Sequence, residues 1–441
     1  MPDLDLVIRG RAVVGAEQIS CGVGVKDGVI VSLDNGSYAE TTIELADDEV
    51  LLPGLVDSHV HVNDPGRESW EGFGTATRAA AAGGVTTIVD MPLNSIPPTI
   101  DVPSLLVKQR TAADRIHVDV GFWGGAVPAS LGNLLPLHEA GVFGFKSFLL
   151  HSGVDEFPAL SPAQFALAMT ELSGPDALMI VHAEDRATID AAPPPTGVHY
   201  RDFLASRPAN AEDLAISGVI AAARRTGARV HVLHLASASA LALIAAAKAD
   251  GVRITAETCP HYLTFCAEEI PDGATPYKCC PPIRDAANRE LLWRGLADGI
   301  IDCVVSDHSP STPDLKDLEH GDFGVAWGGI SGLQLGLSAV WTQARVRGFT
   351  LTDVVRWMAA GPSQVAGLAG KGGIAVGRDA DFCVFAPDDA YVVDPNRLYH
   401  RNPVSAYQGR ALAGVVRQTW LRGHRVSGEN PSGRLLSRGE R

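Results

Sequence analysis

The chain has 441 residues and a formal net charge of −15 at pH 7, with 46% hydrophobic and 20% charged residues. This length and composition are typical of a globular protein with a large core, and they exclude a disordered or fibrous chain. The negative charge, together with the lack of a long Lys/Arg run, argues against a nucleic-acid partner, because phosphate binding needs clustered basic residues.

The sequence also argues against a secreted or membrane protein. The opening residues MPDLDLVIRG lack the basic and apolar regions of a signal peptide, and no stretch stays apolar over the length of a membrane span. The seven cysteines show no framework spacing, which indicates reduced thiols. We therefore expect a soluble, cytoplasmic protein.

Both ends of the chain are predicted to be β-rich. Short alternating runs separated by Gly, Asn and Asp turns occur near the start, in LVIRGRAVV, GVGVKDGVIVSL and TTIELADDEVLL. The same texture returns near the end, in ADFCVFAPD, AYVVD and GVVRQTWLRGHRV. We predict one small β-sandwich domain built from residues 1–52 and 373–441.

Strand-like and helix-like segments alternate between these ends. The helix-like segments include SPAQFALAMTELSG and NAEDLAISGVIAAARRTG, which begin at a Ser or Asn suited to N-capping and end at Gly. The alternation predicts an α/β fold, a (β/α)8 TIM-like barrel over residues 53–372, with its active site at the carboxyl ends of the strands. A doubly wound sheet is the alternative, but no GxGxxG follows an early strand. The apolar, β-branched runs are residues 51–62, 85–92, 117–125, 142–150, 178–184, 229–237, 253–262 and 301–310.

Candidate metal ligands recur in or at the ends of these predicted strands. His59 and His61 share one face of the first strand, because side chains alternate along a strand. Each residue alone would more often be structural, but together the set predicts a binuclear site for divalent cations, since imidazole and carboxylate are ligands for zinc and its neighbours. The later strands contribute Lys146, His182, His234 and Asp307.

Lys146 is the least expected of these residues. It lies in the apolar run GVFGFKSFLL, so its amine must either reach solvent or take part in chemistry. A lysine with a lowered pKa could form a Schiff base with a carbonyl substrate. Alternatively, its neutral amine could react with carbon dioxide, and the resulting N6-carboxylysine could bridge two cations. The four histidines favour the carbamate.

Such a site predicts metal-assisted hydrolysis. Two cations about 3.5–4 Å apart would hold a hydroxide and polarise the scissile carbonyl. Asp307 would accept the proton of the hydroxide as general base and pass it to the leaving nitrogen as general acid.

With these residues assembled, the chain resembles the cyclic amidohydrolases. The motifs that carry the resemblance run from about Gly54 to Gly373: GLVDSHVHVNDPGRESWEGF, GGVTTIVDMPLNSIPPT, GFKSFLLHSGVDEFP, VHAED, HVLHLASA, ETCPHYLTF, KCCPPIRDAANRE and SDHSPS. The resemblance implies a carbamylated Lys146 and two metal ions per subunit, zinc first, with cobalt, manganese or iron as alternatives. Members of this family are often homotetramers, so the resemblance also implies a homotetramer. The ligands it implies are His59, His61, Lys146, His182, His234 and Asp307.

The residue that follows the HxH motif bears on the substrate. Dihydroorotases, a branch of the same family, usually have an arginine two residues after HxH to hold a substrate carboxylate, whereas this chain has Asn63. The resemblance therefore implies a neutral hydantoin-ring substrate such as allantoin, opened to allantoate in purine catabolism. Arg67 is a possible second contact. The substrate contacts that we expect are Asn63, Asn94, Cys280, Asn288 and Ser309.

Three other functions remain open at this point. A hydantoinase or dihydropyrimidinase would share the fold and the metal site. A non-catalytic scaffold related to dihydropyrimidinases would be expected to lack metal ligands, and none is missing. A Schiff-base lyase would use Lys146 without a metal. We further expect His151, His261 and His308 to support or pack around the site, and residues 192–201 to form either a lid or a plain connecting loop.

Overall fold

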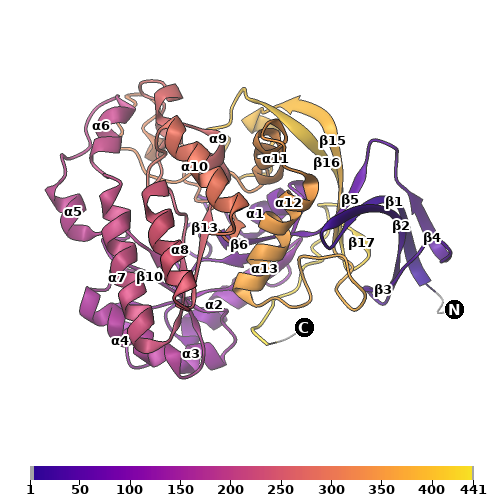
Figure 1. The fold of residues 1–441 in the computed structure, drawn as a ribbon, viewed down its shortest axis with the longest axis horizontal. Helices are drawn as coiled ribbons and strands as arrows, with labels where there is room; N and C mark the ends of the chain where they lie inside the picture. The colour runs from indigo at the N-terminus through magenta and orange to yellow at the C-terminus, as the bar shows by residue number, and fades with distance from the viewer. Residues whose placement is uncertain (1–3, 440–441) are drawn as a thin grey trace.

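The computed structural model describes residues 4–439, and its strands form three sheets. In Figure 1 the indigo strands from the start of the chain lie at one side of the molecule, next to the yellow strands from its end, and helices such as α4 and α7 lie at the other side. The helices in residues 4–439 include none that is both long enough and apolar enough to cross a bilayer.

The largest sheet contains strands from both ends of the chain. Its order is β17-β16-β15-β5-β1-β2-β3, and β4 pairs with β1. β1 and β2 form an antiparallel hairpin around Gly15, whose φ of 60° lies in the left-handed region that favours glycine. The eight strands are β1 (Leu4–Val14), β2 (Glu17–Lys26), β3 (Val29–Leu33), β4 (Ala39–Glu44), β5 (Val50–Pro53), β15 (Phe382–Val392), β16 (Ala411–Leu421) and β17 (His424–Arg425).

The pairing of β5 with β15 joins the two ends of the chain. Leu52 lies opposite Cys383 in this antiparallel pair. Burial of apolar surface stabilises the sheet, and Leu51 and Phe382 share one buried cluster with Ile8 and Val23. The strands of the two ends therefore have a core in common.

The middle of the chain forms two parallel sheets, and each of the eight predicted runs contains at least one strand of them. The six-stranded sheet has the order β14-β13-β12-β11-β10-β9, and the three-stranded sheet has the order β6-β7-β8. The strands are β6 (Leu55–Val60), β7 (Val85–Asp90), β8 (Asp119–Phe122), β9 (Gly124–Gly125), β10 (Phe145–Phe148), β11 (Leu178–His182), β12 (Arg229–Val232), β13 (Ile254–Thr258) and β14 (Cys303–Val304).

The prediction of a single strand over residues 51–62 is wrong. The chain changes sheets at Gly54, because β5 pairs with β15 whereas β6 pairs with β7. The chain is tightly packed at this crossing, where a Cβ on Gly54 would lie 2.2 Å from Thr86 Oγ1. The two histidines of the HxH motif also fall in different elements: His59 lies within β6, whereas His61 is the first residue after this strand.

Two contacts bring the ends of the parallel sheets together. β8 and β9 are separated only by Trp123, whose backbone N–H donates to Asp90 O at 3.0 Å. At the other end, Val60 forms an isolated parallel bridge with His308, and the His61 N–H donates to His308 O at 2.8 Å. The segment after β14 therefore lies beside the end of β6.

The helices follow the strands in the alternating order that the sequence predicts. Ser161 caps α4, accepting a hydrogen bond from the Gln164 N–H, and α7 ends at Gly227 with a φ of 70°. The sequence predicts Asn210 as the cap of α7, but the helix begins one residue earlier than this prediction requires. Asn210 is its first helical residue, and Ala209 occupies the cap position. The helices are α1 (Phe73–Ala82), α2 (Val102–Ala112), α3 (Leu135–Glu139), α4 (Pro162–Ser173), α5 (Arg186–Ala191), α6 (Tyr200–Ala205), α7 (Asn210–Thr226), α8 (Leu241–Ala249), α9 (Pro260–Thr264), α10 (Ala286–Ala297), α11 (Gly336–Val346), α12 (Leu351–Val355) and α13 (Gly361–Ala366).

Candidate metal centre

His59 lies at the centre of the predicted ligand set. Its ring is fully buried, and Nδ1 lies 2.5 Å from Glu257 Oε1. The other ring nitrogen, Nε2, lies 3.1 Å from Asp307 Oδ1 and 3.4 Å from Lys146 Nζ. Nδ1 of His59 is therefore held by Glu257, an acid from β13, while Nε2 faces two other predicted ligands, Asp307 and Lys146.

His61 is arranged in the same way. Its Nδ1 lies 3.0 Å from Leu93 O, and its Nε2 lies 3.7 Å from Asp307 Oδ1. The two rings of the HxH motif have centroids 5.5 Å apart. Both histidines thus direct Nε2 toward Asp307, as expected for side chains on one face of a strand.

His182 and His234 complete the group of histidines. Their ring centroids are 4.6 Å apart, and the centroid of His234 is 5.3 Å from that of His59. His182 Nε2 lies 2.6 Å from Glu184 Oε2. His234 Nδ1 is buried and finds no hydrogen-bond partner among residues 4–439. A buried imidazole nitrogen without a partner is costly, so this atom is available for a ligand.

Lys146 is buried beside these histidines. Its Nζ lies 4.9 Å from the centre of the Phe148 ring, whereas Ser147 points the other way and donates to Met179 Sδ at 3.4 Å. Burial lowers the pKa of Lys146 to about 8, although the carboxylates of Asp307 and Glu257 act in the opposite direction. A substantial fraction of this amine is therefore neutral near neutral pH.

The charges of the other groups suit a metal ligand set. Burial lowers the pKa of His61 and His234 well below the usual range, so both imidazoles are neutral. Burial acts to raise the pKa of Asp307, but His59 beside it outweighs this effect and holds it well below its usual range. One nitrogen each of His59 and His234 and one oxygen of Asp307 lie within 4.8 Å of one another. Burial acts to lower the pKa of His59, but the carboxylates of Asp307 and Glu257 outweigh it and raise this pKa. Once His59 has lost its second proton, two imidazoles and a carboxylate at this spacing could hold a divalent cation.

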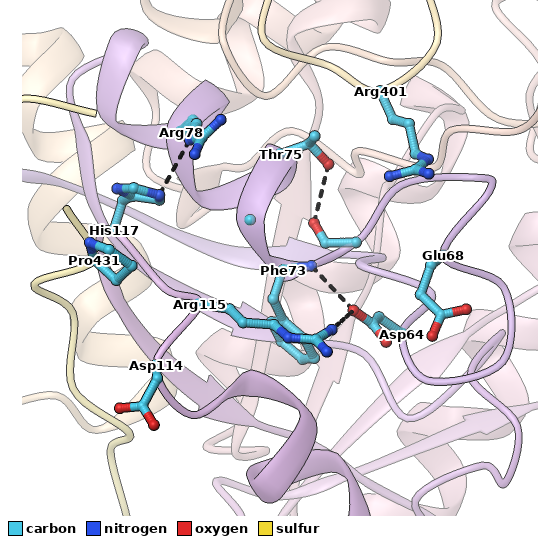
Figure 2. A pocket seen from close by; sticks show the side chains of 12 residues that line it. Asp64, Glu68, Phe73, Thr75, Arg78, Asp114, Arg115, His117, Arg401 and Pro431 are labelled. Carbon is cyan, nitrogen blue, oxygen red and sulfur yellow. Dashed lines mark hydrogen bonds and ion pairs between the residues drawn. The ribbon is translucent and has the colours of Figure 1, made fainter. Parts of the chain in front are cut away.

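A cavity of about 490 Å³ opens onto this group. Phe148, Phe203 and Trp327 form part of its wall. A second cavity of about 360 Å³, shown in Figure 2, lies at the N-terminus of α1 and contains none of the predicted site residues. The predicted residues that line the first cavity are His61, Asn94, Lys146, His182, Cys280, His234, Asp307 and Ser309.

Two predicted substrate contacts do not line this cavity. Asn63 is buried, and its Oδ1 accepts from Asn94 Nδ2 at 3.1 Å. Asn288 donates to Ala236 O and accepts from the Ala238 N–H, both at 2.8 Å, and it lies at a separate cavity. The reason is that α10 begins at Ala286, so Asn288 falls in its first turn and faces the loop after β12.

Arg67 does not line the cavity either, and it instead stabilises the loop that follows β6. Its Nη1 lies 2.5 Å from both Glu156 Oε1 and Asn94 O. This contact ties the loop after β6 to the backbone of Asn94, which does line the cavity.

The residues around the site differ in their surroundings. His308 is fully buried with Nε2 3.0 Å from Glu71 Oε2, and burial lowers the pKa of His261 to about 4. His151 is exposed at the cavity, 3.3 Å from Asp155. In the segment 192–201, the Gly197 N–H donates to Asp322 Oδ1 at 2.9 Å. The seven cysteines, all within the described range, form no disulfide, as the sequence predicts.

The acids that hold the histidines were not among the predicted site residues. Glu257 contacts His59, and Glu184 contacts both His182 and Arg207, whose Nη1 lies 2.5 Å away. A signal for both was present: Glu184 is two residues after His182 in VHAED, and Glu257 is an acid within a predicted buried strand. A charged residue in a buried strand needs a partner, so both acids were candidates.

Comparison with known proteins identifies the family of the chain. Residues 50–426 match the amidohydrolase family. The chain is 59% identical to the allantoinase of Streptomyces avermitilis, over 99% of this chain and 100% of that one. It is 48% identical to the allantoinase of Saccharomyces cerevisiae, over 88% and 85% of the two chains. Among solved structures, the L-hydantoinase (dihydropyrimidinase) of Arthrobacter aurescens matches with a TM-score of 0.92 and 28% identity, over 99% of this chain and all of that one. Because the family pattern covers most of its length, the chain belongs to the amidohydrolase family.

Proposed function

We propose that this protein hydrolyses the cyclic amide of allantoin to allantoate, a step of purine catabolism. The assignment of allantoin as the substrate rests on the identity of 59% to an allantoinase over nearly the whole of both chains. The observation that supports the chemistry is that five of the six predicted ligands line one cavity, and the sixth, His59, contacts Asp307 directly behind it. Water attacks the ring carbonyl, the C–N bond breaks, and the ring nitrogen gains a proton.

Two divalent cations, with zinc as the first candidate, would be held by the six predicted ligands. The fit rests on the free His234 Nδ1 and on the inward Nε2 atoms of His59 and His61. The near-neutral amine of Lys146 suits conversion to a carbamate, which would bring oxygen ligands. Bound cations would lower the pKa of water and polarise the carbonyl. The ligands would be His59, His61, Lys146 as N6-carboxylysine, His182, His234 and Asp307.

Asp307 is the proposed general base and general acid. Its carboxylate lines the cavity and is held ionised beside His59. An ionised carboxylate can accept the proton of the attacking water and then donate it to the leaving nitrogen. Asn94, Cys280 and Ser309 line the same cavity and are the proposed substrate contacts. Asn63 would act through its hydrogen bond to Asn94, and we propose no contact for Asn288.

We further propose that the two parallel sheets are parts of one closed (β/α)8 barrel over residues 53–372. The contacts at Trp123 and between Val60 and His308 support this closure. The sheet shared by both ends supports a composite β-sandwich domain of residues 1–52 and 373–441, of which residues 1–3 and 440–441 lie outside the described part of the chain. The homotetramer and the cytoplasmic location stay predictions.

A hydantoinase or dihydropyrimidinase is the second candidate. The structural likeness to the Arthrobacter aurescens L-hydantoinase, with a TM-score of 0.92, favours it. The two candidates share their chemistry and differ in the size of the ring that they open or in its substituent.

Elemental analysis combined with product formation tests the proposal. Purified protein is assayed on allantoin, hydantoin and dihydrouracil before and after chelation. We expect about two metal ions per chain and chelator-sensitive turnover of allantoin in preference to the other rings. Faster turnover of dihydrouracil would favour the second candidate, and protein without metal or turnover would refute both.

A matched pair of variants tests the role of Asp307. Asp307→Asn should lower kcat by about 10²–10⁴-fold, because it removes the group that transfers the proton. Asp298→Asn, at the exposed end of α10, is the control and should leave kcat unchanged. Equal kcat for the two variants would contradict the role of Asp307.

A further inference from the structure

We propose that Glu257 is a positioning residue of the hydrolytic site, which fixes His59 in the tautomer whose unprotonated Nε2 faces the predicted ligands Asp307 and Lys146. We further infer that His231 and Thr255 hold Glu257 in place. The inference rests on the proposed function, because the inward nitrogen of His59 matters only if it binds a metal ion.

Glu257 is the meeting point of three hydrogen-bond donors. It lies on β13 and is 1% exposed. Its Oε1 lies 2.5 Å from His59 Nδ1 and accepts from the His234 N–H at 3.1 Å, while its Oε2 lies 2.9 Å from His231 Nε2. One carboxylate therefore contacts two histidine rings and the backbone of a third histidine.

These contacts determine where the protons lie. An ionised carboxylate can only accept hydrogen bonds, so His59 Nδ1 and His231 Nε2 must both carry a proton. A histidine must be neutral to bind a metal ion, and a neutral imidazole has a single N–H. Because that N–H is on Nδ1 and directed at Glu257, the lone pair of a metal-bound His59 would lie on Nε2. That atom is the one that lies 3.1 Å from Asp307 Oδ1. Glu257 thus selects the tautomer that a metal ligand needs.

His231 and Thr255 extend the chain of hydrogen bonds. They are neighbours across β12 and β13, and His231 Nδ1 lies 2.8 Å from Thr255 Oγ1. Because the proton of His231 is on Nε2, the Thr255 hydroxyl is the donor in this pair. The chain runs from Thr255 through His231 and Glu257 to His59, and it links β13, β12 and β6.

The backbone of His234 depends on the same carboxylate. Its φ of 35° lies in the left-handed region, which is strained for a residue with a side chain. The hydrogen bond from its N–H to Glu257 Oε1 supports this conformation. Loss of Glu257 would therefore disturb two predicted ligands, one through its ring and one through its backbone.

The hydrogen-bond chain predicts different results for two substitutions. In Glu257→Gln, the side-chain oxygen can still accept from His59 Nδ1, and the amide can donate to His231 if the proton of His231 moves to Nδ1. The Thr255 hydroxyl permits this change, because it can accept as well as donate. Glu257→Leu offers none of these contacts.

Zinc binding by the metal-free protein tests this expectation without relying on activity. Competition with a chromophoric chelator gives the affinity, and circular dichroism checks that each variant is folded. We expect Glu257→Leu to weaken zinc binding by about 10–100-fold and Glu257→Gln to weaken it less. Glu319→Gln, at an exposed loop position, is the control. Affinities equal to the wild type in both Glu257 variants would overturn the inference.

A double variant separates the tautomer from simple packing. Thr255→Val in the wild type removes only a donor to His231, whereas in Glu257→Gln it removes the acceptor that the shifted proton of His231 needs. The amide must then turn its N–H groups toward His59 and force a proton onto the inward Nε2. We expect Thr255→Val to weaken zinc binding about tenfold more in the Glu257→Gln background than in the wild type.

The outcomes of this cycle are distinct. If the losses of zinc affinity caused by Thr255→Val and by Glu257→Gln simply multiply in the double variant, the proposed link between the tautomers of His231 and His59 is overturned. A wild-type protein that binds no zinc would instead refute the proposed function, whatever the variants do.

Discussion

Reloading of the metal-free protein with zinc tests the proposed carbamate on Lys146 through its pH dependence. Only the neutral amine reacts with carbon dioxide, and burial lowers the pKa of Lys146 to about 8. With this pKa about one-tenth of Lys146 is neutral at pH 7, which is about 300-fold more than for a lysine with the ordinary value of 10.5. Carbamylation should therefore be far faster at this residue than at the surface lysines.

The sign of the effect follows from the same equilibrium. The neutral fraction rises tenfold per pH unit below the pKa and levels off above it, so the rate of reactivation should increase about 25-fold between pH 6.5 and 8.5. Chelated protein is incubated with zinc at each pH and at constant dissolved carbon dioxide. Samples are then assayed on allantoin at one common pH, and native mass spectrometry reports whether the mass of one carbon dioxide is gained.

Matched variants and a trapping experiment decide the result. Lys146→Gln should neither gain this mass nor reactivate, whereas Lys248→Gln, whose Nζ pairs with Asp302 near the surface, should behave as the wild type. Reactivation that is independent of carbon dioxide, or whose midpoint lies near pH 10, would refute the reasoning. Borohydride trapping of substrate on Lys146 without metal dependence would point to the Schiff base.

Two further predictions concern stability. Lys371→Met should lower the free energy of unfolding by about 3–5 kcal/mol in urea titrations, because Nζ lies 2.6 Å from Asp119 and 2.7 Å from Asp381 and its loss leaves both buried carboxylates without this partner; an unchanged midpoint would contradict this. Asp64, seen in Figure 2 beside Arg115, has its pKa raised to about 6 by burial, so the folded state loses stability as pH rises from about 4 to 6. Asp64→Asn should therefore be about 1–2 kcal/mol more stable than the wild type at pH 7.5 and no more stable at pH 4, and equal gains at both pH values would contradict the role of ionisation.

The strands of the middle region could be predicted because they are buried on both faces and read as continuous apolar runs. The same uniformity hid the change of sheet at Gly54. Residues 51–62 are apolar throughout their first half, and although Pro53 and Gly54 mark a break close to the predicted domain boundary, nothing local shows which sheet each half joins. The boundary depends on the partners, Cys383 for Leu52 and Val85 for Leu55, which are distant in the sequence. Periodicity therefore predicts that a strand exists but not which sheet it joins.

The residues facing the cavity could be predicted for a different reason. Parallel strands place their carboxyl ends at one edge, so His59, His182 and Asp307 converge without knowledge of the loops. Loop and helix residues have no such rule. Asn288 follows a motif that was expected to line the pocket, but Asp285 caps α10 and turns Asn288 toward the backbone of Ala236.

The choice of ring nitrogen is the part of the site that only the structure reveals. His59 and His61 have Nδ1 engaged, by an acid from another strand and by a backbone carbonyl, whereas His182 has Nε2 engaged, by Glu184. The first two histidines therefore direct Nε2 toward Asp307, and His182 is left to present Nδ1. The residue type is the same in each case, so the difference comes from the hydrogen-bond partner alone. Since the two acids are themselves held by further contacts, Glu257 by His231 and Glu184 by Arg207, the imidazoles of His59 and His182 are oriented before any ligand binds.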